Sequence, residues 1–243
     1  MHKLRVERST LAKVRPLIEG GHYLGKVHNR GRFAFALMDG QKLVGAALFG
    51  QPARETVSVS LWKCENDEDR KHAAAATLEL TRFYTIAKEE LPHNAGTWFL
   101  ARAVRMLRQG DSPGKRDLFG KVPTSDIEML VAFSDPAAKH HGGLYQAAGW
   151  LYTGASATDH YHYEDKDGNR VAKQTPWYYA KRNGLRPGER PADGERRVAD
   201  EKGWTKVKDQ PKHRYVKPLT RDAEQSLRLK LPVLSYPKPR PCD

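Results

Sequence analysis

A dense group of polar side chains lies in the stretch from 131 to 154, VAFSDPAAKHHGGLYQAAGWLYTG. An apolar run typical of a buried central strand ends at Ser134, and Asp135 and a proline follow directly. A carboxylate at the end of a central strand lies where open sheets keep their binding crevice. His140, a Gly-Gly pair and Tyr145 come next. Asp can act as a base and Tyr as an acid. The stretch predicts either a catalytic pocket or a capped helix with Tyr145 in the core.

A second candidate site is the turn LPHNAGTW, between the strand-like run LELTRFYTI and a helix. Asn94 or Thr97 can cap that helix, whose apolar face holds Leu100 and Leu107. Backbone amides at a helix N-terminus bind phosphate without a charged side chain. No Walker-type or dinucleotide glycine pattern is present, and an ordinary capped helix is the alternative.

Alternation in the strand-like run LELTRFYTI predicts that Arg82 shares a face with Leu80 and Tyr84. His22 and Tyr23 follow the first helical segment, where a loop can cover a substrate. His22, Asp135 and His140 are residue types that bind zinc or ferrous iron. No HExxH or paired-cysteine spacing supports a metal, so no metal site is predicted.

The region after 155 interleaves basic and aromatic residues. Its members are Lys173, Trp177, Tyr178, Tyr179, Lys181, Arg182, Arg186, Arg190, Arg196, Arg197, Lys206, Lys208, Lys212 and Arg214. Basic side chains neutralise phosphates, and aromatic rings stack on unstacked bases. The region therefore favours nucleic-acid contact over a solvated insertion whose aromatics pack on the domain.

The composition supports an anionic partner and a reducing compartment. Net charge is +13 and the pI is near 9.7, with 29% charged and 39% hydrophobic residues. Such basicity points to nucleic acid, another polyanion or an anionic surface. No run approaches a spanning helix, and the start MHKLRVERSTL has no signal-peptide core. Cys64 and Cys242 are too few for a disulfide scaffold or a thiolate zinc site, and suit a cytoplasm.

The order of strand-like and helical segments predicts an α/β (α+β) fold with a mixed central sheet flanked by helices. The clearest hairpin is GRFAFALMDGQKLVGAALFG, with Asp39-Gly40 as its turn. The expected division is a main domain of residues 1–155 plus 212–222, a basic loop-rich insertion at 156–211 and a Pro-rich tail at 223–243.

The motifs in this order resemble the phage Mom family of DNA-modification proteins. The resemblance spans about residues 20–155 and returns at 212–219. It implies a GNAT-type N-acyltransferase fold. It also implies transfer of a carbamoylmethyl (acetamido) group to N6 of adenine in double-stranded phage DNA. That modification protects the DNA from host restriction, and the implied location is the host cytoplasm.

The same resemblance assigns the site residues. His22 and Tyr23 match the family's His-Tyr pair beside the acceptor, and His140 matches the family's histidine. Asp135 matches its Asp-Pro aspartate, here preceded by Ser134. Tyr145 matches the helix tyrosine that commonly protonates the departing thiolate of coenzyme A in this fold. The implied catalytic set is Asp135, Tyr145, His140, His22, Tyr23 and Ser134.

The implied cofactor-binding set is Arg82, Asn94, Ala95, Gly96, Thr97 and Trp98, placed where the fold binds pyrophosphate. The usual R/Q-x-x-G-x-G/A glycines are missing there, so a glycyl or other aminoacyl donor stays open beside acetyl-CoA. The alternatives are an acyltransferase acting on tRNA, a protein or a small amine, and a non-catalytic DNA-binding phage protein. The expected partners are double-stranded DNA and an acyl-donor small molecule or aminoacyl-tRNA, with no membrane.

Overall fold

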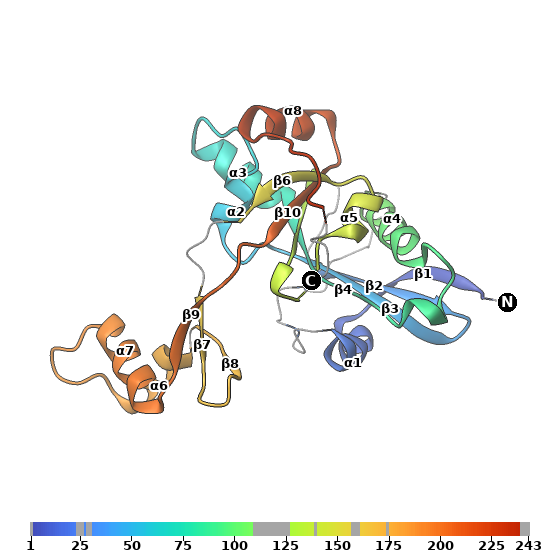
Figure 1. The fold of residues 1–243 in the computed structure, drawn as a ribbon. Helices are drawn as coiled ribbons and strands as arrows, with labels where there is room; N and C mark the ends of the chain where they lie inside the picture. The colour runs from blue at the N-terminus through green and yellow to red at the C-terminus, as the bar shows by residue number, and fades with distance from the viewer. Residues whose placement is uncertain are drawn as a thin grey trace. The chain divides into compact units, whose positions relative to one another are not determined.

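The computed structural model describes residues 2–22, 27, 31–108, 127–138, 140–156, 161–173 and 175–238. The chain divides into two compact units (Figure 1). The first unit is Met1–Ala155 with Lys212–Asp243, and the second is Ser156–Pro211.

Seven strands of the first unit form one sheet, in the order β1-β2-β3-β4-β5-β10-β6. They are β1 (Leu4–Ser9), β2 (Gly31–Asp39), β3 (Lys42–Gly50), β4 (Thr77–Thr85), β5 (Met129–Ser134), β6 (Leu151–Ala155) and β10 (His213–Pro218). Neighbouring strands are antiparallel except β4 and β5, which are parallel. The prediction of a mixed sheet is confirmed. Asp39 ends β2 and Gly40 has φ 57°, as the tight turn of the predicted hairpin requires.

Helices cover both faces of this sheet, as predicted. They are α1 (Leu11–Gly21), α2 (Glu55–Val59), α3 (Asp67–Ala76), α4 (Ala95–Arg108), α5 (Gly143–Ala147) and α8 (Arg221–Lys230), with 3₁₀ helices at Lys88–Glu90 and Pro136–Ala138. Helix α4 packs on one face, against a core that contains Phe35, Leu80 and Leu130. Helices α1, α3 and α8 pack on the opposite face, where Val14 meets Ala46. No described helix is both long and apolar enough to cross a membrane.

Strands β4 and β5 pair over three residues only. Thr77, Leu78 and Glu79 align with Met129, Leu130 and Val131. Beyond them β4 continues beside β3 to Thr85, and β5 continues beside β10 to Ser134. The carboxyl ends of the two central strands therefore have no ladder between them. An opening of this kind between parallel strands is a place where a ligand can reach the middle of a sheet.

A β-bulge at Thr81 corrects the predicted alternation in β4. Phe49 aligns with Leu80 and Leu48 with Arg82, so β4 has one residue more than β3 at this point. Leu80 belongs to the core under α4, whereas Arg82 lies opposite Leu48 on the α1 face. Residues aligned across antiparallel strands share a face, and one extra residue reverses the faces that follow. The predicted grouping of Leu80 with Arg82 is therefore wrong.

The second unit is not loop-rich, which corrects the expectation for 156–211. It contains a three-stranded sheet in the order β8-β7-β9 and two helices. These elements are β7 (Tyr161–Glu164), β8 (Arg170–Val171), β9 (Thr205–Lys208), α6 (Thr175–Asn183) and α7 (Pro191–Lys202). Tyr161 and Tyr163 both donate hydrogen bonds from their hydroxyls to Glu195 of α7, which ties this helix to the sheet.

The predicted tail at 223–243 is also corrected, because α8 occupies Arg221–Lys230. Thr220 caps this helix by accepting a hydrogen bond from the amide of Ala223 at 3.1 Å. After it, Leu234 bridges to Tyr152, and the Tyr236 hydroxyl donates to the carbonyl of Trp150 at 2.9 Å. The segment that follows α8 therefore runs along β6.

Candidate active site

Asp135 closes the turn at the carboxyl end of β5. Its Oδ1 accepts a hydrogen bond from the amide of Ala137 at 3.1 Å, and its carbonyl accepts from the amide of His140 at 3.0 Å. Its Oδ2 lies 3.1 Å from Nζ of Lys212, and the aspartate side chain is 14% exposed. The two interpretations of the sequence are compatible here, because Asp135 caps a turn and still places a carboxylate at the strand end.

His22 lies at the end of α1, on the face of the sheet to which the bulge turns Arg82. Burial is the largest cause that lowers the pKa of His22 to about 4, and the charges of Arg82 and His140 act in the same direction. These three side chains are therefore close enough to interact. Because an added Cβ on Gly21 would lie 2.1 Å from the Tyr84 ring, α1 approaches β4 closely just before His22.

Tyr215 of β10 supports the loop that follows Asp135, through both its hydroxyl and its ring. The Tyr215 hydroxyl donates a hydrogen bond to the carbonyl of His141 at 2.7 Å. Nε2 of Gln146 donates to the same hydroxyl at 3.0 Å and to the His141 carbonyl at 3.1 Å. Tyr215 is fully buried, so this network fixes the backbone between His140 and α5.

The Gly-Gly pair has a clear physical role at its first member. Gly142 has φ 78°, and a Cβ added there would lie 2.2 Å from a ring carbon of Tyr215. An L-residue is strained in this backbone region, and the buried ring cannot move away. Gly143 has open space around it. The close approach of loop to ring therefore requires glycine at 142 but not at 143.

Tyr145 lies in an aromatic stack on the α4 side of the sheet. Its ring centroid is 5.4 Å from that of Trp150 and 5.2 Å from that of Tyr215. The side chain is partly buried against the main core. Packing of this kind fixes the direction of a phenol ring. Tyr145 therefore packs against the core, as one of the two interpretations predicted. It also lies in the first turn of α5, which follows the Asp135 loop.

The predicted cofactor-binding turn lies beside α5. An added Cβ on Gly96 would be 3.6 Å from Leu144 and 3.9 Å from Phe83, so the start of α4 meets α5 and β4 here. Asn94, with φ 65°, directly precedes the helix, and its carbonyl accepts a hydrogen bond from the amide of Trp98 at 2.9 Å. Thr97 lies inside the helix, so of the two expected caps only Asn94 is at the helix start. The amides of Gly96 and Thr97 have no acceptor among the described residues. Two donors at a helix N-terminus can bind an anionic oxygen.

The remaining candidate residues differ in how exposed they are, and one of them lies outside the described residues. Ser134 is 5% exposed and its hydroxyl has no partner among the described residues. Ala95 is buried, whereas Trp98 is 41% exposed. Tyr23 lies outside the described residues. No group of three His, Cys, Asp or Glu in the described part of the chain is arranged to hold a metal.

The structure thus brings the predicted residues together in two groups, both at the carboxyl ends of β4 and β5. His22, Arg82, His140 and Asp135 form a polar group with Lys212. Tyr145 and the start of α4 lie on the opposite face of the sheet. The strand ends between the two groups are not joined by a β-ladder. Acid–base groups and anion-binding amides near the same strand ends suit a group-transfer reaction.

Sequence reasoning missed Tyr215 and Gln146, and it named Arg214 only as one of the basic residues expected to contact nucleic acid. Arg214 of β10 donates to Thr153 Oγ1 at 2.9 Å, to the Thr153 carbonyl at 3.2 Å and to Ser60 Oγ at 3.4 Å. Burial lowers the pKa of this guanidinium, and no carboxylate among the described residues pairs with it. The motif KHRYVKPL indicated a strand, but nothing in it marks which side chains face the loop.

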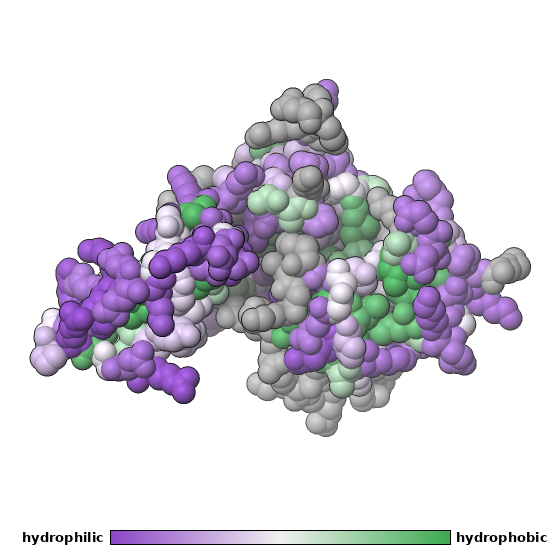
Figure 2. All heavy atoms as spheres, turned by 60° about the horizontal axis from the view of Figure 1, so that its bottom comes forward, coloured by the Kyte–Doolittle hydropathy of each residue, from purple (hydrophilic) through white to green (hydrophobic). Residues whose placement is uncertain are grey.

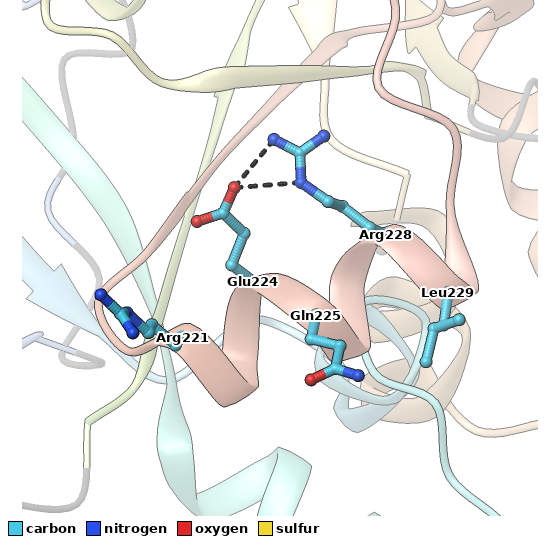
Figure 3. Close-up of a pocket in the computed structure, with 5 residues that line it drawn as sticks. All are labelled: Arg221, Glu224, Gln225, Arg228 and Leu229. Carbon is cyan, nitrogen blue, oxygen red and sulfur yellow. Dashed lines mark hydrogen bonds and ion pairs between the residues drawn. The ribbon is translucent and has the colours of Figure 1, made fainter.

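A surface hollow also lies along α8. Arg221, Glu224, Gln225, Arg228 and Leu229 line it, all from this one helix (Figure 3). Arg228 closes one side by donating two hydrogen bonds to Oε1 of Glu224, at 2.8 and 3.0 Å. The lining has no histidine, tyrosine, serine or cysteine, so the hollow lacks the chemistry of the β4–β5 opening.

A comparison with protein families decides where the chain belongs. Residues 3–238 match the Mom protein family, which is nearly the whole sequence. The chain belongs to the Mom protein family. The resemblance inferred from the motifs is therefore confirmed. No curated protein sequence matches this Mom family member.

Solved structures similar to this Mom family member include acetyltransferases. A Bacillus subtilis acetyltransferase in complex with CoA has a TM-score of 0.42 and 9% identity, over 90% of this chain and 100% of that one. The Vibrio cholerae spermidine/spermine N-acetyltransferase SpeG has 0.43 and 10%, over 92% and 96%. Aminoglycoside acetyltransferase AAC(6')-Ib, in complex with coenzyme A and kanamycin, has 0.39 and 14%, over 70% and 92%. Similarity at this level transfers no activity.

We expect Gly142→Ala to destabilise the protein by about 2–4 kcal/mol, because left-handed strain and the clash with a buried ring add up. Gly143→Ala is the matched control, and its effect should stay below about 0.5 kcal/mol. Urea unfolding followed by circular dichroism measures both. Equal stability of the two variants would contradict the close contact with Tyr215.

His22 should titrate near pH 4 in an NMR titration of its ring protons. The unfolded chain takes up this proton near pH 6.5 and the folded chain only near 4, so acidification through that window should lower the free energy of unfolding. His22→Gln should reduce this dependence, and Arg82→Gln should raise the pKa of His22. A value near 6.5 in the native protein would show that His22 is neither buried nor close to Arg82.

Proposed function

We propose that this protein transfers an acyl-derived group to the N6 amine of adenine in double-stranded DNA. Attack on the acyl carbon of a glycyl donor gives N6-glycyl adenine and releases the donor's leaving group. This product is an isomer of the carbamoylmethyl (acetamido) adenine that protects phage DNA from host restriction in the host cytoplasm, so forming the latter takes a rearrangement as a second step. The observation that carries the proposal is the polar group around Asp135 at the open ends of β4 and β5, in a chain that belongs to the Mom protein family.

The Asp135 side is where the acceptor amine is deprotonated. The adenine amine is a weak nucleophile, since its lone pair is delocalised into the ring, so loss of its proton must accompany attack. Asp135 accepts that proton as the new N–C bond forms, and the ammonium of Lys212 holds the carboxylate in place. His22 is neutral at pH 7 because its pKa is about 4, so it adds no repulsive charge beside Arg82 and orients the base.

The Tyr145 side is where the leaving group departs. The Tyr145 hydroxyl gives its proton to the departing atom as the bond between donor and transferred group breaks. The aromatic stack with Trp150 and Tyr215 keeps the phenol at a fixed angle during this step. The backbone from Ser134 to His140 supplies amides for a developing oxyanion.

The start of α4 fits the phosphates of an acyl-donor cofactor in part. The amides of Gly96 and Thr97 would hold one phosphate, and Arg82 belongs to the other face, where it meets His22. Arg82 therefore acts on the acceptor side and not on the donor side. Coenzyme A would supply an activated acyl group as a thioester, and an aminoacyl donor would supply it as an ester.

The target amine lies inside a base pair, so the adenine must leave the stack to reach Asp135. Extruding one base costs roughly a few kcal/mol, which phosphate contacts offset. Arg82 and Lys212 place positive charge at the same strand ends, where the flanking phosphates would lie.

Nucleoside mass spectrometry of DNA from expressing cells tests this function. We expect a modified adenine with the wild-type protein, and at least about a hundredfold less with Asp135→Asn or Tyr145→Phe, since a lost acid or base costs 10²–10⁴-fold. Resistance of the DNA to adenine-sensitive restriction enzymes should fall in parallel. Ala147→Ser, an exposed change on α5, is the matched control and should keep the modification.

The mass of the modified adenine also identifies the class of donor. A glycyl and a carbamoylmethyl group have the same elemental composition, whereas an acetyl group has one nitrogen fewer. The parent mass therefore separates an acetyl donor from an aminoacyl one, and fragmentation separates the two isomers. An unmodified adenine pool with the wild-type protein would overturn the proposed function and favour a different amine acceptor or a DNA-binding role.

A further inference from the structure

The second unit carries little net charge, although it contains many basic residues. Residues 156–211 contain 12 Lys and Arg and 10 Asp and Glu, so most of the +13 net charge lies elsewhere in the chain. Its surface is mostly hydrophilic in the view of Figure 2. What matters for binding is which of these cations already have a carboxylate partner.

The arginines around α7 are paired within the unit. Arg190 donates to Asp193 at 2.8 Å, and Arg196 lies 4.0 Å from the same carboxylate. Arg197 donates to Glu189 at 2.8 Å. The pairing holds the pKa of Glu189 down at about 2. The other arginine pairs are Arg170 with Asp209, Arg186 with Glu201 and Arg197 with Glu201. The arginines beside α7 are therefore paired. Lys202, at the end of this helix, has no ion pair among the described residues, and its Nζ lies 5.6 Å from the centroid of the Tyr179 ring.

Several lysines of the unit lie instead over aromatic rings. Nζ of Lys173 and Nζ of Lys206 are 4.0 and 3.9 Å from the centroid of the Tyr161 ring. Nζ of Lys181 is 5.1 Å from that of Trp177. Among the described residues none of these lysines has a carboxylate within ion-pair distance. A cation over a ring keeps its charge and remains open to a phosphate on its solvent side.

Helix α6 presents such cations in a regular pattern. Its buried residues, Pro176 and Ala180, face the rest of the unit, and an added Cβ on Gly194 of α7 would lie 3.3 Å from Ala180. The two helices are therefore closely packed (Figure 1). The outward stripe is aromatic and cationic at helical spacing, and consists of Trp177, Tyr178, Lys181 and Arg182. Tyr178 is 62% exposed, and Arg182 has no ion pair among the described residues.

We propose that this α6 stripe, together with the Tyr161–Lys173–Lys206 group, is the surface through which the second unit binds the phosphate backbone of DNA. The paired arginines of α7 form a scaffold and do not contribute. The identity of the nucleic acid as DNA rests on the proposed function. The choice of surface rests on the ion pairs and ring contacts of this unit alone.

Two full-length variants, each with two positive charges removed, test whether DNA binding depends on this surface or only on the protein's net charge. K181Q/R182Q removes two cations from α6, and R190Q/R196Q removes one from the residue before α7 and one from α7 itself. Fluorescence anisotropy with a labelled duplex gives the dissociation constant over a range of salt concentrations. Circular dichroism and thermal unfolding check that each variant is folded.

The α6 variant should bind roughly tenfold or more weakly at physiological salt, and its log–log salt slope should be shallower by about 2, for two lost phosphate contacts. The α7 variant should change affinity by no more than about twofold, because an arginine already paired with a carboxylate displaces little counterion from DNA. Tyr178→Ala should weaken binding to single strands more than binding to a duplex, because the exposed ring can stack on an unpaired base.

Equal losses in the two double variants, or a larger loss in R190Q/R196Q, would overturn this choice of surface. The outcome is independent of catalysis. If the wild-type protein modifies adenine and neither variant binds DNA more weakly, the surface is wrong and the proposed function stands. If the wild-type protein binds DNA as described and no adenine is modified, the surface stands and the proposed function fails.

Discussion

The separation of β4 from β5 after three paired residues is the constraint on which the candidate site depends. Parallel strands that stayed paired to their ends would fill the middle of the sheet with backbone hydrogen bonds. Here β4 stays with β3 and β5 stays with β10, so the ends of the two central strands are free to frame a ligand. The bulge at Thr81 then determines what β4 contributes, because it turns Arg82 toward His22.

The loop after β5 is fixed by contacts with β10 and with the residue before that strand. Tyr215 supports it from β10 with a hydrogen bond to the His141 carbonyl, and Gly142 lets the loop lie directly on the ring. Lys212, one residue before β10, pairs with Asp135. One strand thus fixes the carboxylate and the loop together. A transfer site needs this because a misplacement of about 1 Å costs a large part of the rate.

Much of this was predictable from the sequence. The Asp39-Gly40 hairpin, the mixed sheet and the apolar face of α4 follow from turn chemistry and periodicity, and Asp135 at a strand end follows from the apolar run before it. The face of Arg82 was not predictable, since one extra residue in a strand reverses a period of two. Contacts between distant segments, such as Tyr215 with Gly142 or Lys212 with Asp135, leave no local pattern. The same holds for the ion pairs that neutralise the arginines of α7.

Photo-crosslinking tests the central claim, that adenine reaches the open ends of β4 and β5. A duplex that carries photoreactive 8-azidoadenine is irradiated with the full-length protein, digested, and analysed by mass spectrometry. The account predicts that adenine is attached to peptides that contain His22 or the stretch from Ser134 to Tyr145. Attachment confined to α8 or to the unit Ser156–Pro211 would contradict it.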